Sequence, residues 1–268
     1  MQLITLTTDF GRRDWFVGAM KGVILGLHPH ATVVDLTHEI PAGDVRAGAF
    51  ALAAGFRFFL KGTVHVAVVD PGVGSARRAI AVQTEKYFFV GPDNGVLSLA
   101  LAREKIKAIR QLTNEKFFLK SVSQTFHGRD VFAPVAAHLR RGVPIQKLGP
   151  ALKDFVRLDW LQPRITPTEV EGEVVYIDRF GNAITNIPNE ELQGCVWKVF
   201  TQRKEICSVE PFYQSVRTGL PVAVPRSSGF LEIAVNGGSA ARKLDLKIGD
   251  HVLLHANKRE KFCNPSKE

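Results

Sequence analysis

VVDPGVGSARR, residues 68–78, shows where one strand of the fold ends and which side chains follow it. The apolar run TVHVAVVD ends in Asp70. Pro and Gly residues then predict a tight turn, and Arg77 and Arg78 precede a second apolar run. Two interpretations are open. The stretch is a strand end with a solvated basic turn, or the turn holds Asp70 and one arginine at the edge of a site.

Strands and helices alternate on both sides of this stretch, up to about residue 150. Apolar runs predict strands at 1–8, 31–38 and 63–70, with two more inside 77–95, and helical spacing predicts helices at 14–27, 44–60, 96–105 and 131–142. The alternation indicates an α/β domain with a largely parallel central sheet. Ligands of such sheets bind outside the carboxyl ends of the strands. We therefore expect the polar strand ends TTDFG, DLTH and VVDPGVG to share one edge.

The pattern changes after residue 155. The segment LDWLQPRITPTEVEG contains two prolines and is typical of a linker, and short β-rich runs separated by turn residues follow it. These runs predict a smaller all-β, barrel-like domain. We expect an α/β N-terminal domain at 1–155, a linker at 156–169, the all-β domain at 170–258 and a basic tail at 259–268.

The composition is that of a globular protein, with 268 residues, 45% hydrophobic and 23% charged. No apolar run reaches the ~18 residues of a membrane span, and the N-terminus does not resemble a signal peptide. The three cysteines, Cys195, Cys207 and Cys263, form no CxxC pair. We therefore expect neither a disulfide framework nor a cysteine-based zinc site, and we expect a reducing, cytoplasmic location.

The formal net charge of +9 raises the question of a nucleic-acid partner. The basic residues are scattered, and the one dense cluster is the C-terminal tail, which is typical of a solvated terminus. Aromatic residues do not alternate with basic ones as they do on a platform for single strands. Nucleic-acid binding is therefore only a minor alternative.

Two polar clusters lie in the α/β part. In TTDFGRRD, Asp14 is explained as a helix cap. Asp9 is less fully explained by a local turn, because a carboxylate at a strand end can also accept hydrogen bonds from both hydroxyls of a ribose. In TFHGRDVFAP, His127 stands just before a predicted helix, with Asp130 as a natural cap and Gly128 permitting close approach.

Two further clusters lie in the β-rich part. DRFGNAITNI is either a β-turn closed by Asp178 and Asn182 or a purine pocket, in which Phe180 supplies a stacking face and Asn182 a donor and an acceptor. RSSGFLEIAVNGGSA presents Ser227 and Asn236 around two turns, which could also be plain hairpin turns.

The order of these motifs resembles a known family. TDFG, VVDPGVG followed by RR, PDNG, FHGRDVFAP, DRFGNAITNI and SSGFLEIAVNGGSAA occur in sequence from about residue 3 to about 256. This is similar to the S-adenosyl-L-methionine (SAM) hydroxide adenosyltransferases, or SAM hydrolases, which are relatives of fluorinase and chlorinase. The resemblance implies a homotrimer, with SAM between the N-terminal domain of one subunit and the C-terminal domain of its neighbour. SAM is then the substrate, with no separate cofactor and no metal.

The resemblance also implies roles for individual residues that bind the substrate. Asp9 would hold the ribose hydroxyls, and Asp14, Asp178 and Ser227 would contact the methionine part. Phe180 and Asn182 would form the adenine pocket, where Asn236 and Gly237 present backbone to the base.

VVDPGVGSARR distinguishes the branches of the family. The hydroxide-using branch is marked by an Asp–Arg–His set, and Asp70, Arg77 and His127 match it. Halogenating relatives lack the set and carry Ser in place of Gly128. Neighbouring strand residues point to opposite sides, so we expect Arg77 to face the site and Arg78 to be solvated.

The implied reaction is attack of water or hydroxide on ribose C5′, opposite the sulfonium sulfur, which gives adenosine and L-methionine. Either His127 takes the proton of the water while Asp70 orients the imidazole, or Arg77 stabilises a hydroxide electrostatically. The alternatives for the whole protein are a non-catalytic SAM or adenosine binder and, more remotely, a SAM-dependent halogenase.

Overall fold

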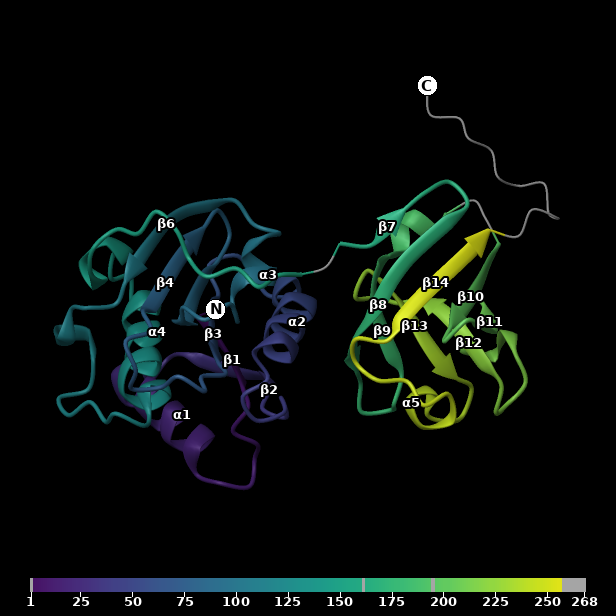
Figure 1. Ribbon diagram of the computed structural model, residues 1–268. Helices are drawn as coiled ribbons and strands as arrows, with labels where there is room; N and C mark the ends of the chain where they lie inside the picture. The colour runs from purple at the N-terminus through teal and green to yellow at the C-terminus, as the bar shows by residue number, and fades with distance from the viewer. Residues whose placement is uncertain (1, 161, 194–195, 257–268) are drawn as a thin grey trace. The chain divides into compact units, whose positions relative to one another are not determined.

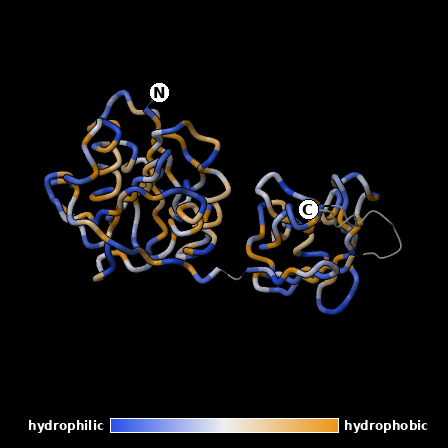
Figure 2. Tube along the Cα trace, turned by 90° about the horizontal axis from the view of Figure 1, so that it is seen from above, coloured by the Kyte–Doolittle hydropathy of each residue, from blue (hydrophilic) through white to orange (hydrophobic). Residues whose placement is uncertain are grey.

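The computed structural model describes residues 2–160, 162–193 and 196–256 (Figure 1). The chain divides between Asp159 and Trp160 into two compact units, and each has a hydrophobic core of its own. Apolar and polar segments alternate along the trace of both units (Figure 2). Cys195, Cys263 and the basic tail at 259–268, on which the sequence made predictions, lie outside the described residues.

The first unit is built on a six-stranded sheet in the order β2-β1-β3-β5-β4-β6. The strands are β1 (Leu3–Thr8), β2 (Thr32–Thr37), β3 (Val64–Val68), β4 (Ala79–Thr84), β5 (Phe88–Pro92) and β6 (Ile106–Gln111). Strand β4 is antiparallel to both its neighbours, and the other adjacent pairs are parallel. The predicted α/β domain with a largely parallel sheet is therefore confirmed, while β6 is a strand that the sequence did not predict.

Helices cover both faces of this sheet, with α1 and α4 on one side and α2 and α3 on the other (Figure 1). The helical segments are α1 (Phe16–Leu27), α2 (Val45–Gly55), η1 (Phe56–Phe58), α3 (Ser98–Leu101), η2 (Glu115–Phe117), the π-helical turn η3 (Gly128–Phe132), α4 (Ala133–Arg140) and η4 (Ile145–Leu148). Two predicted helices are too long. The one at 44–60 tightens into a 3₁₀ turn after Gly55, and the one at 96–105 is a four-residue helix.

The residues at the N-termini of the helices allow the predicted helix caps to be checked one by one. Asp44 caps α2 as helix-capping preferences indicate, since its Oδ1 accepts from the backbone N–H of Ala47 at 2.9 Å. The predicted cap by Asp14 is wrong, because the N-cap of α1 is Trp15. Asp130 is also not a cap. It lies buried inside η3, and its carboxylate accepts hydrogen bonds from Arg129 and from the backbone N–H of Ser123.

The polar strand ends meet at one edge of the sheet. Strands β1, β2, β3 and β5 all end there, and β4 begins there because it runs in the opposite direction. The two arginines that precede β4 are thereby brought to the same edge as the residues that follow the parallel strands. This edge carries the candidate catalytic residues.

The second unit is an antiparallel sheet in the order β11-β10-β14-β8-β9-β13-β12, with β7 paired to β8 (Figure 1). Its elements are β7 (Arg164–Ile165), β8 (Glu169–Ile177), β9 (Ala183–Pro188), η5 (Asn189–Leu192), β10 (Trp197–Thr201), β11 (Lys204–Ser208), η6 (Tyr213–Ser215), β12 (Pro221–Pro225), β13 (Phe230–Val235), α5 (Ala240–Lys243) and β14 (His251–Ala256). A bridge between Val209 and Ala223 nearly closes the sheet. The predicted all-β, barrel-like domain is confirmed, and β7 and β11 were not predicted.

Across the described ranges, none of the helices combines the length and the apolar character needed to span a bilayer.

Candidate active site

Asp9 follows β1 directly and is fixed by a backbone group from another loop. Its Oδ2 accepts from the N–H of Gly43 at 2.8 Å, and the backbone N–H of Phe10 donates to Thr8 Oγ1 at 3.2 Å. A carboxylate has about four lone-pair sites, so Asp9 can still accept hydrogen bonds from a pair of hydroxyls. Asp14 lies beyond the bend and is exposed.

Asp70 and Arg77 form an ion pair across the turn of VVDPGVGSARR. Arg77 Nε donates to Asp70 Oδ1 at 3.0 Å, and Arg77 Nη2 is paired with Asp70 Oδ2. The contact is therefore bidentate, which is the strongest geometry available to an Arg–carboxylate pair. Both side chains are largely enclosed, with 5% of Asp70 and 11% of Arg77 exposed. The guanidinium also lies over the ring of Phe132, 5.4 Å from its centroid.

His127 completes this cluster from the start of η3. Its Nδ1 lies 2.9 Å from Arg77 Nη2. Burial, together with the positive charge of Arg77, lowers the pKa of His127 below its ordinary value. The structure thus brings together Asp70, Arg77 and His127, which the sequence placed up to 57 residues apart. Arg77 stands in the middle and contacts both of the others.

Aromatic packing ties the loop of Asp9 to the segment of His127. The rings of Phe10 and Phe126 are 5.7 Å apart, and Phe16 lies 5.2 Å from Phe126. Phe10 follows Asp9 in the chain and Phe126 precedes His127. A side chain on Gly128 would enter this cluster, since an added Cβ would come within 3.3 Å of Phe10, Met20 and Phe126.

Arg78 is not the solvated residue that the sequence predicted. It pairs with the buried carboxylate of Asp93 at 2.6 Å and with Asp154 at 2.9 Å. Asp93 Oδ1 also accepts from the backbone N–H of Val156 at 2.7 Å. The two adjacent arginines have different partners, and those of Arg78 form an ion-pair cluster near the end of the unit.

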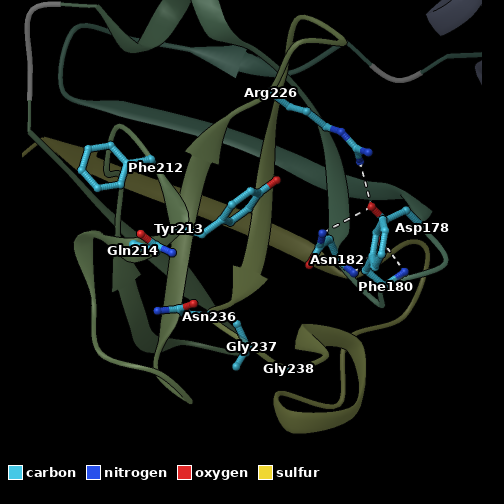
Figure 3. Close-up of a pocket in the computed structure, with 11 residues that line it drawn as sticks. Asp178, Phe180, Asn182, Phe212, Tyr213, Gln214, Arg226, Asn236, Gly237 and Gly238 are labelled. Atoms are coloured by element: carbon cyan, nitrogen blue, oxygen red, sulfur yellow. Dashed lines mark hydrogen bonds and ion pairs between the residues drawn. The ribbon is translucent and has the colours of Figure 1, made fainter.

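The second unit contains an open pocket of about 860 Å³ (Figure 3). Asp178, Phe180 and Asn182 lie together on one side of it, and Phe212 and Gln214 on the other. Its lining consists of Asp178, Phe180, Asn182, Phe212, Tyr213, Gln214, Arg226, Val235, Asn236, Gly237 and Gly238. Five residues that the sequence singled out, at 178, 180, 182, 236 and 237, therefore share one cavity.

The turn of DRFGNAITNI is the β-turn of the first interpretation, and it also lines the pocket. Asp178 Oδ1 accepts from the backbone N–H of Phe180 at 2.9 Å and of Asn182 at 3.0 Å, so the local β-turn exists. Gly181 makes it possible, with φ of +81° and Ser239 packed where a Cβ would stand. The same turn exposes 66% of Phe180 toward the pocket, so its ring is available for stacking.

A charged cluster at the wall of this pocket was missed from the sequence. Arg226 Nη1 lies 3.1 Å from Asp178 Oδ2 and 2.5 Å from Glu232 Oε2, and Tyr213 donates its hydroxyl hydrogen to Glu232 Oε1 at 2.7 Å. Glu232 is fully buried. Burial raises its pKa, and burial with the hydrogen bond to Glu232 raises the pKa of Tyr213 to about 12. A lone Glu in the apolar run FLEIAV was the available signal, since a buried carboxylate needs partners.

The remaining predicted residues of this unit lie on turns. Ser227 is exposed in the turn between β12 and β13, next to Arg226, and it does not line the pocket. Asn236 is held by its side chain, which donates to the carbonyl of Val216 at 2.8 Å. Gly237 follows it at the pocket wall. Across the described ranges, no three His, Cys, Asp or Glu side chains are grouped so as to hold a metal ion.

Comparison with known proteins identifies the family. The model of the SAM hydroxide adenosyltransferase N-terminal domain matches residues 4–149, and that of the C-terminal domain matches residues 172–253. The chain belongs to the SAM hydroxide adenosyltransferase family. The expectation drawn from the motifs is thereby confirmed, and the two family domains coincide with the α/β unit and the β-barrel-like unit.

Several members of this family are similar over nearly the whole chain. The (R)-S-adenosyl-L-methionine hydrolase of Salinispora tropica is 41% identical over 257 residues, which cover 94% of this chain and 97% of that protein. The enzyme of the same name from Thermus thermophilus is 40% identical, covering 95% and 100%. The fluorinase of an Actinoplanes species is more distant, at 26% identity over 92% of this chain and 95% of that protein.

A solved structure shows the same fold. The crystal structure of an uncharacterized conserved protein from Thermotoga maritima superposes with a TM-score of 0.89 at 39% identity. It covers 94% of this chain and 99% of that one.

Proposed function

We propose that this protein hydrolyses SAM to adenosine and L-methionine. The observation that carries the proposal is the contact of Arg77 with both Asp70 and His127 at the carboxyl edge of the sheet. These residues match the set that marks the hydroxide-using branch of the family. Curated relatives at about 40% identity that bear the name SAM hydrolase support the same conclusion.

The proposed reaction is a displacement at ribose C5′. An oxygen of water or hydroxide attacks C5′ opposite the sulfonium, the C5′–O bond forms, and the C5′–S bond breaks with its electron pair going to sulfur. Methionine leaves as a neutral thioether, and the proton of the attacking water passes to solvent. Holding the oxygen and C5′ in line can supply several kcal/mol of the barrier reduction.

The cluster geometry favours electrostatic activation over proton abstraction by His127. A guanidinium only donates hydrogen bonds, so His127 Nδ1 must accept from Arg77 in their 2.9 Å contact. Neutral His127 then carries its proton on Nε2, which makes that nitrogen a donor as well. The lowered pKa of His127 keeps the ring neutral. Arg77 and His127 would together hold an attacking hydroxide oxygen by donated hydrogen bonds.

Asp70 has a different role from the one that the base mechanism gave it. Its carboxylate is engaged bidentately by Arg77, and the His127 ring is oriented by Arg77 instead. We assign Asp70 to holding the guanidinium plane. A substitution at Asp70 should therefore act on turnover through the position of Arg77.

The substrate-binding roles follow the same family pattern. We assign Asp9 to the ribose hydroxyls, and the pocket face of Phe180 and Asn182 to adenine, beside Asn236 and Gly237. Asp178 is assigned to the ammonium group of the methionine part. Asp14 and Ser227 are proposed as its further contacts, and their exposure leaves them accessible.

We propose that the protein acts as a homotrimer, with each site shared between the N-terminal domain of one subunit and the C-terminal domain of the next. Mixing two variants, each impaired in a different half of the site, tests this at a SAM concentration below the KM of the Asp178 variant. An Arg77→Ala subunit and an Asp178→Ala subunit should regain part of the activity when refolded together, because some sites then hold both intact halves. Absence of any regain in a verified mixed oligomer would contradict it.

We also propose that the protein works in the cytoplasm, where SAM is available. The cysteine that the structure describes, Cys207, is a free thiol whose pKa is raised to about 12 by burial, so it is not a reactive group.

Two measurements separate the proposed reaction from its alternatives. The protein is incubated with SAM, and adenosine is followed by chromatography against an uncatalysed control. Adenosine at background level despite bound SAM would favour a non-catalytic binder. A 5′-chloroadenosine peak that rises with chloride while adenosine stays flat would favour a halogenase.

A further inference from the structure

Three side chains, of which Thr8 and His38 are buried and Asp35 is partly exposed, form a chain of polar contacts that ends at the residue before Asp9. Thr8 Oγ1 lies 2.8 Å from His38 Nδ1, and His38 Nε2 lies 3.0 Å from Asp35 Oδ1. Thr8 and His38 are fully buried. Lys21 on α1 pairs with the other oxygen of Asp35 at 2.7 Å. The chain therefore runs from a surface lysine to the last residue of β1.

The Asp9 loop is held at two further points, one by His38 and one by Thr8. The backbone carbonyl of His38 accepts from the N–H of Gly11 at 2.8 Å. The hydroxyl of Thr8, which the His38 ring contacts, accepts from the N–H of Phe10 at 3.2 Å. These bonds fix the residues directly before and after Asp9. The carboxylate is left to be placed by its single bond from Gly43 N–H.

The direction of the hydrogen bonds is consistent along the chain. A carboxylate beside Nε2 favours the tautomer with the proton on that nitrogen, so Nδ1 accepts from the Thr8 hydroxyl. The oxygen of that hydroxyl then accepts from Phe10 N–H. Burial raises the pKa of Asp35, but the hydrogen bonds from Lys21 and His38 outweigh it, so the net pKa is lowered and Asp35 remains an anion.

We infer that Asp35, His38 and Thr8 are positioning residues that set the geometry of Asp9 toward the ribose. The inference rests on the proposed function, because that function assigns Asp9 to the ribose hydroxyls. None of the three residues needs to touch the substrate. Their effect passes through the backbone on either side of Asp9.

The same strand offers a matched control. Thr5, also on β1 and fully buried, makes the same type of bond, with its Oγ1 2.7 Å from Nδ1 of the buried His65. His65 packs against Phe56 and Phe89 inside the unit, and its pKa is lowered to about 3 by burial. Thr5→Val and Thr8→Val therefore each remove a hydroxyl–imidazole bond from one strand, and only Thr8→Val also removes the bond from Phe10 N–H beside Asp9.

The experiment measures the affinity for adenosine by calorimetry, kcat and KM for SAM, and the unfolding midpoint. For Thr8→Val we expect adenosine binding about tenfold weaker and KM for SAM about tenfold higher, with kcat changed less than about threefold. Thr8→Ser, which keeps the hydroxyl, should restore binding to within about twofold. Thr5→Val should lower the unfolding midpoint about as much as Thr8→Val while leaving adenosine affinity within about twofold.

A double variant decides whether the effect passes through Asp9. In an Asp9→Asn background, adding Thr8→Val should weaken adenosine binding less than about twofold, because the group being positioned is already altered. The inference is overturned if the two losses add, if Thr8→Val binds adenosine like the wild type, or if Thr5→Val weakens binding equally.

The outcome also separates this inference from the proposed function. A wild type that binds adenosine but releases none from SAM overturns the hydrolase proposal alone, and the affinity pattern of the variants still tests the positioning residues. A wild type that binds no adenosine overturns the role of Asp9 and the positioning inference with it.

Discussion

The candidate site residues of each unit include an arginine shared between two partners, and the partners differ. Arg77 joins one carboxylate, Asp70, to a neutral imidazole, His127. Arg226 joins two carboxylates, Asp178 and Glu232. With all carboxylates ionised, the first cluster has a net charge of zero and the second has −1.

The net charge of each cluster suits its proposed role, which is activation of the attacking oxygen for Arg77 and binding of the methionine part for Arg226. The cluster of Arg77 keeps donor groups available for an oxygen that carries negative charge. The cluster of Arg226 has an excess of carboxylate, which suits the positively charged ammonium of a methionine moiety. Burial is the largest cause of the raised pKa values of Glu232 and Tyr213, and the negative charge of the neighbouring carboxylates adds to it.

The largest effect, on turnover, should come from removing the planar guanidinium group of Arg77. Arg77→Lys keeps the charge but cannot bond Asp70 bidentately and reach His127 at once, so kcat should fall about 100-fold or more. The kcat of His127→Ala should fall by a similar factor. Both variants should keep KM for SAM within about threefold in steady-state assays. Normal turnover in both would show that this cluster is not the catalytic one.

The corresponding change in the second cluster should act on binding. Asp178→Asn keeps an acceptor for the turn but loses the charge facing the ammonium, so KM for SAM should rise about tenfold. Adenosine lacks that group, and its dissociation constant should change less than about threefold by calorimetry. An equal loss for both ligands would place Asp178 at the nucleoside instead.

A smaller effect, on stability, should follow from filling the space at Gly128. Gly128→Ser pushes a side chain against Phe10, Met20 and Phe126, so the free energy of unfolding should fall by about 1–3 kcal/mol in urea titrations. Gly22→Ser on α1 is the control, since nothing lies within 4 Å of an added Cβ there. Equal stability of the two variants would mean that the aromatic side chains around Gly128 can move aside at no cost in free energy.

The smallest effect is on pH dependence, and it has opposite signs in the two clusters. The pKa of His127 is lowered below 6.5, so the unfolded chain binds more protons there and stability falls as pH drops below about 6.5. The pKa of Glu232 is raised above 4.5, so the folded chain binds more protons there and stability falls as pH rises above about 4.5. His127→Ala and Glu232→Gln should each remove one of these slopes from unfolding curves measured between pH 4 and 8. Unchanged slopes would contradict the corresponding shift.

The fold was predictable where local chemistry and packing agree. Asp44 precedes an apolar helix and caps it, and the alternation of strands and helices gives the largely parallel sheet. Two of the missed strands, β6 and β11, are edge strands, and their sequences IKAIRQ and KEICS carry the charges that protect an exposed edge. Such charges hide the alternation on which a prediction depends.

The site was predictable only in part. Asp70, Arg77 and His127 were found through family motifs, but the central place of Arg77 depends on side-chain geometry that no spacing encodes. Glu232 stood in the printed sequence as one acid in an apolar strand. Its partners Tyr213 and Arg226 come from separate loops, so the cluster required the fold.

The position of β4 has a consequence for how the chain refolds. In the sheet, β5 lies between β3 and β4, although it follows both in the chain. Asp70 follows β3 and Arg77 precedes β4, so the two residues pair across the end of β5, which is synthesised after both strands. Because β3 and β4 share no ladder, we expect their ends to be held in place only once β5 has docked between them. After dilution from denaturant, activity should return later than secondary structure. The delay would measure how long β5 takes to dock between β3 and β4.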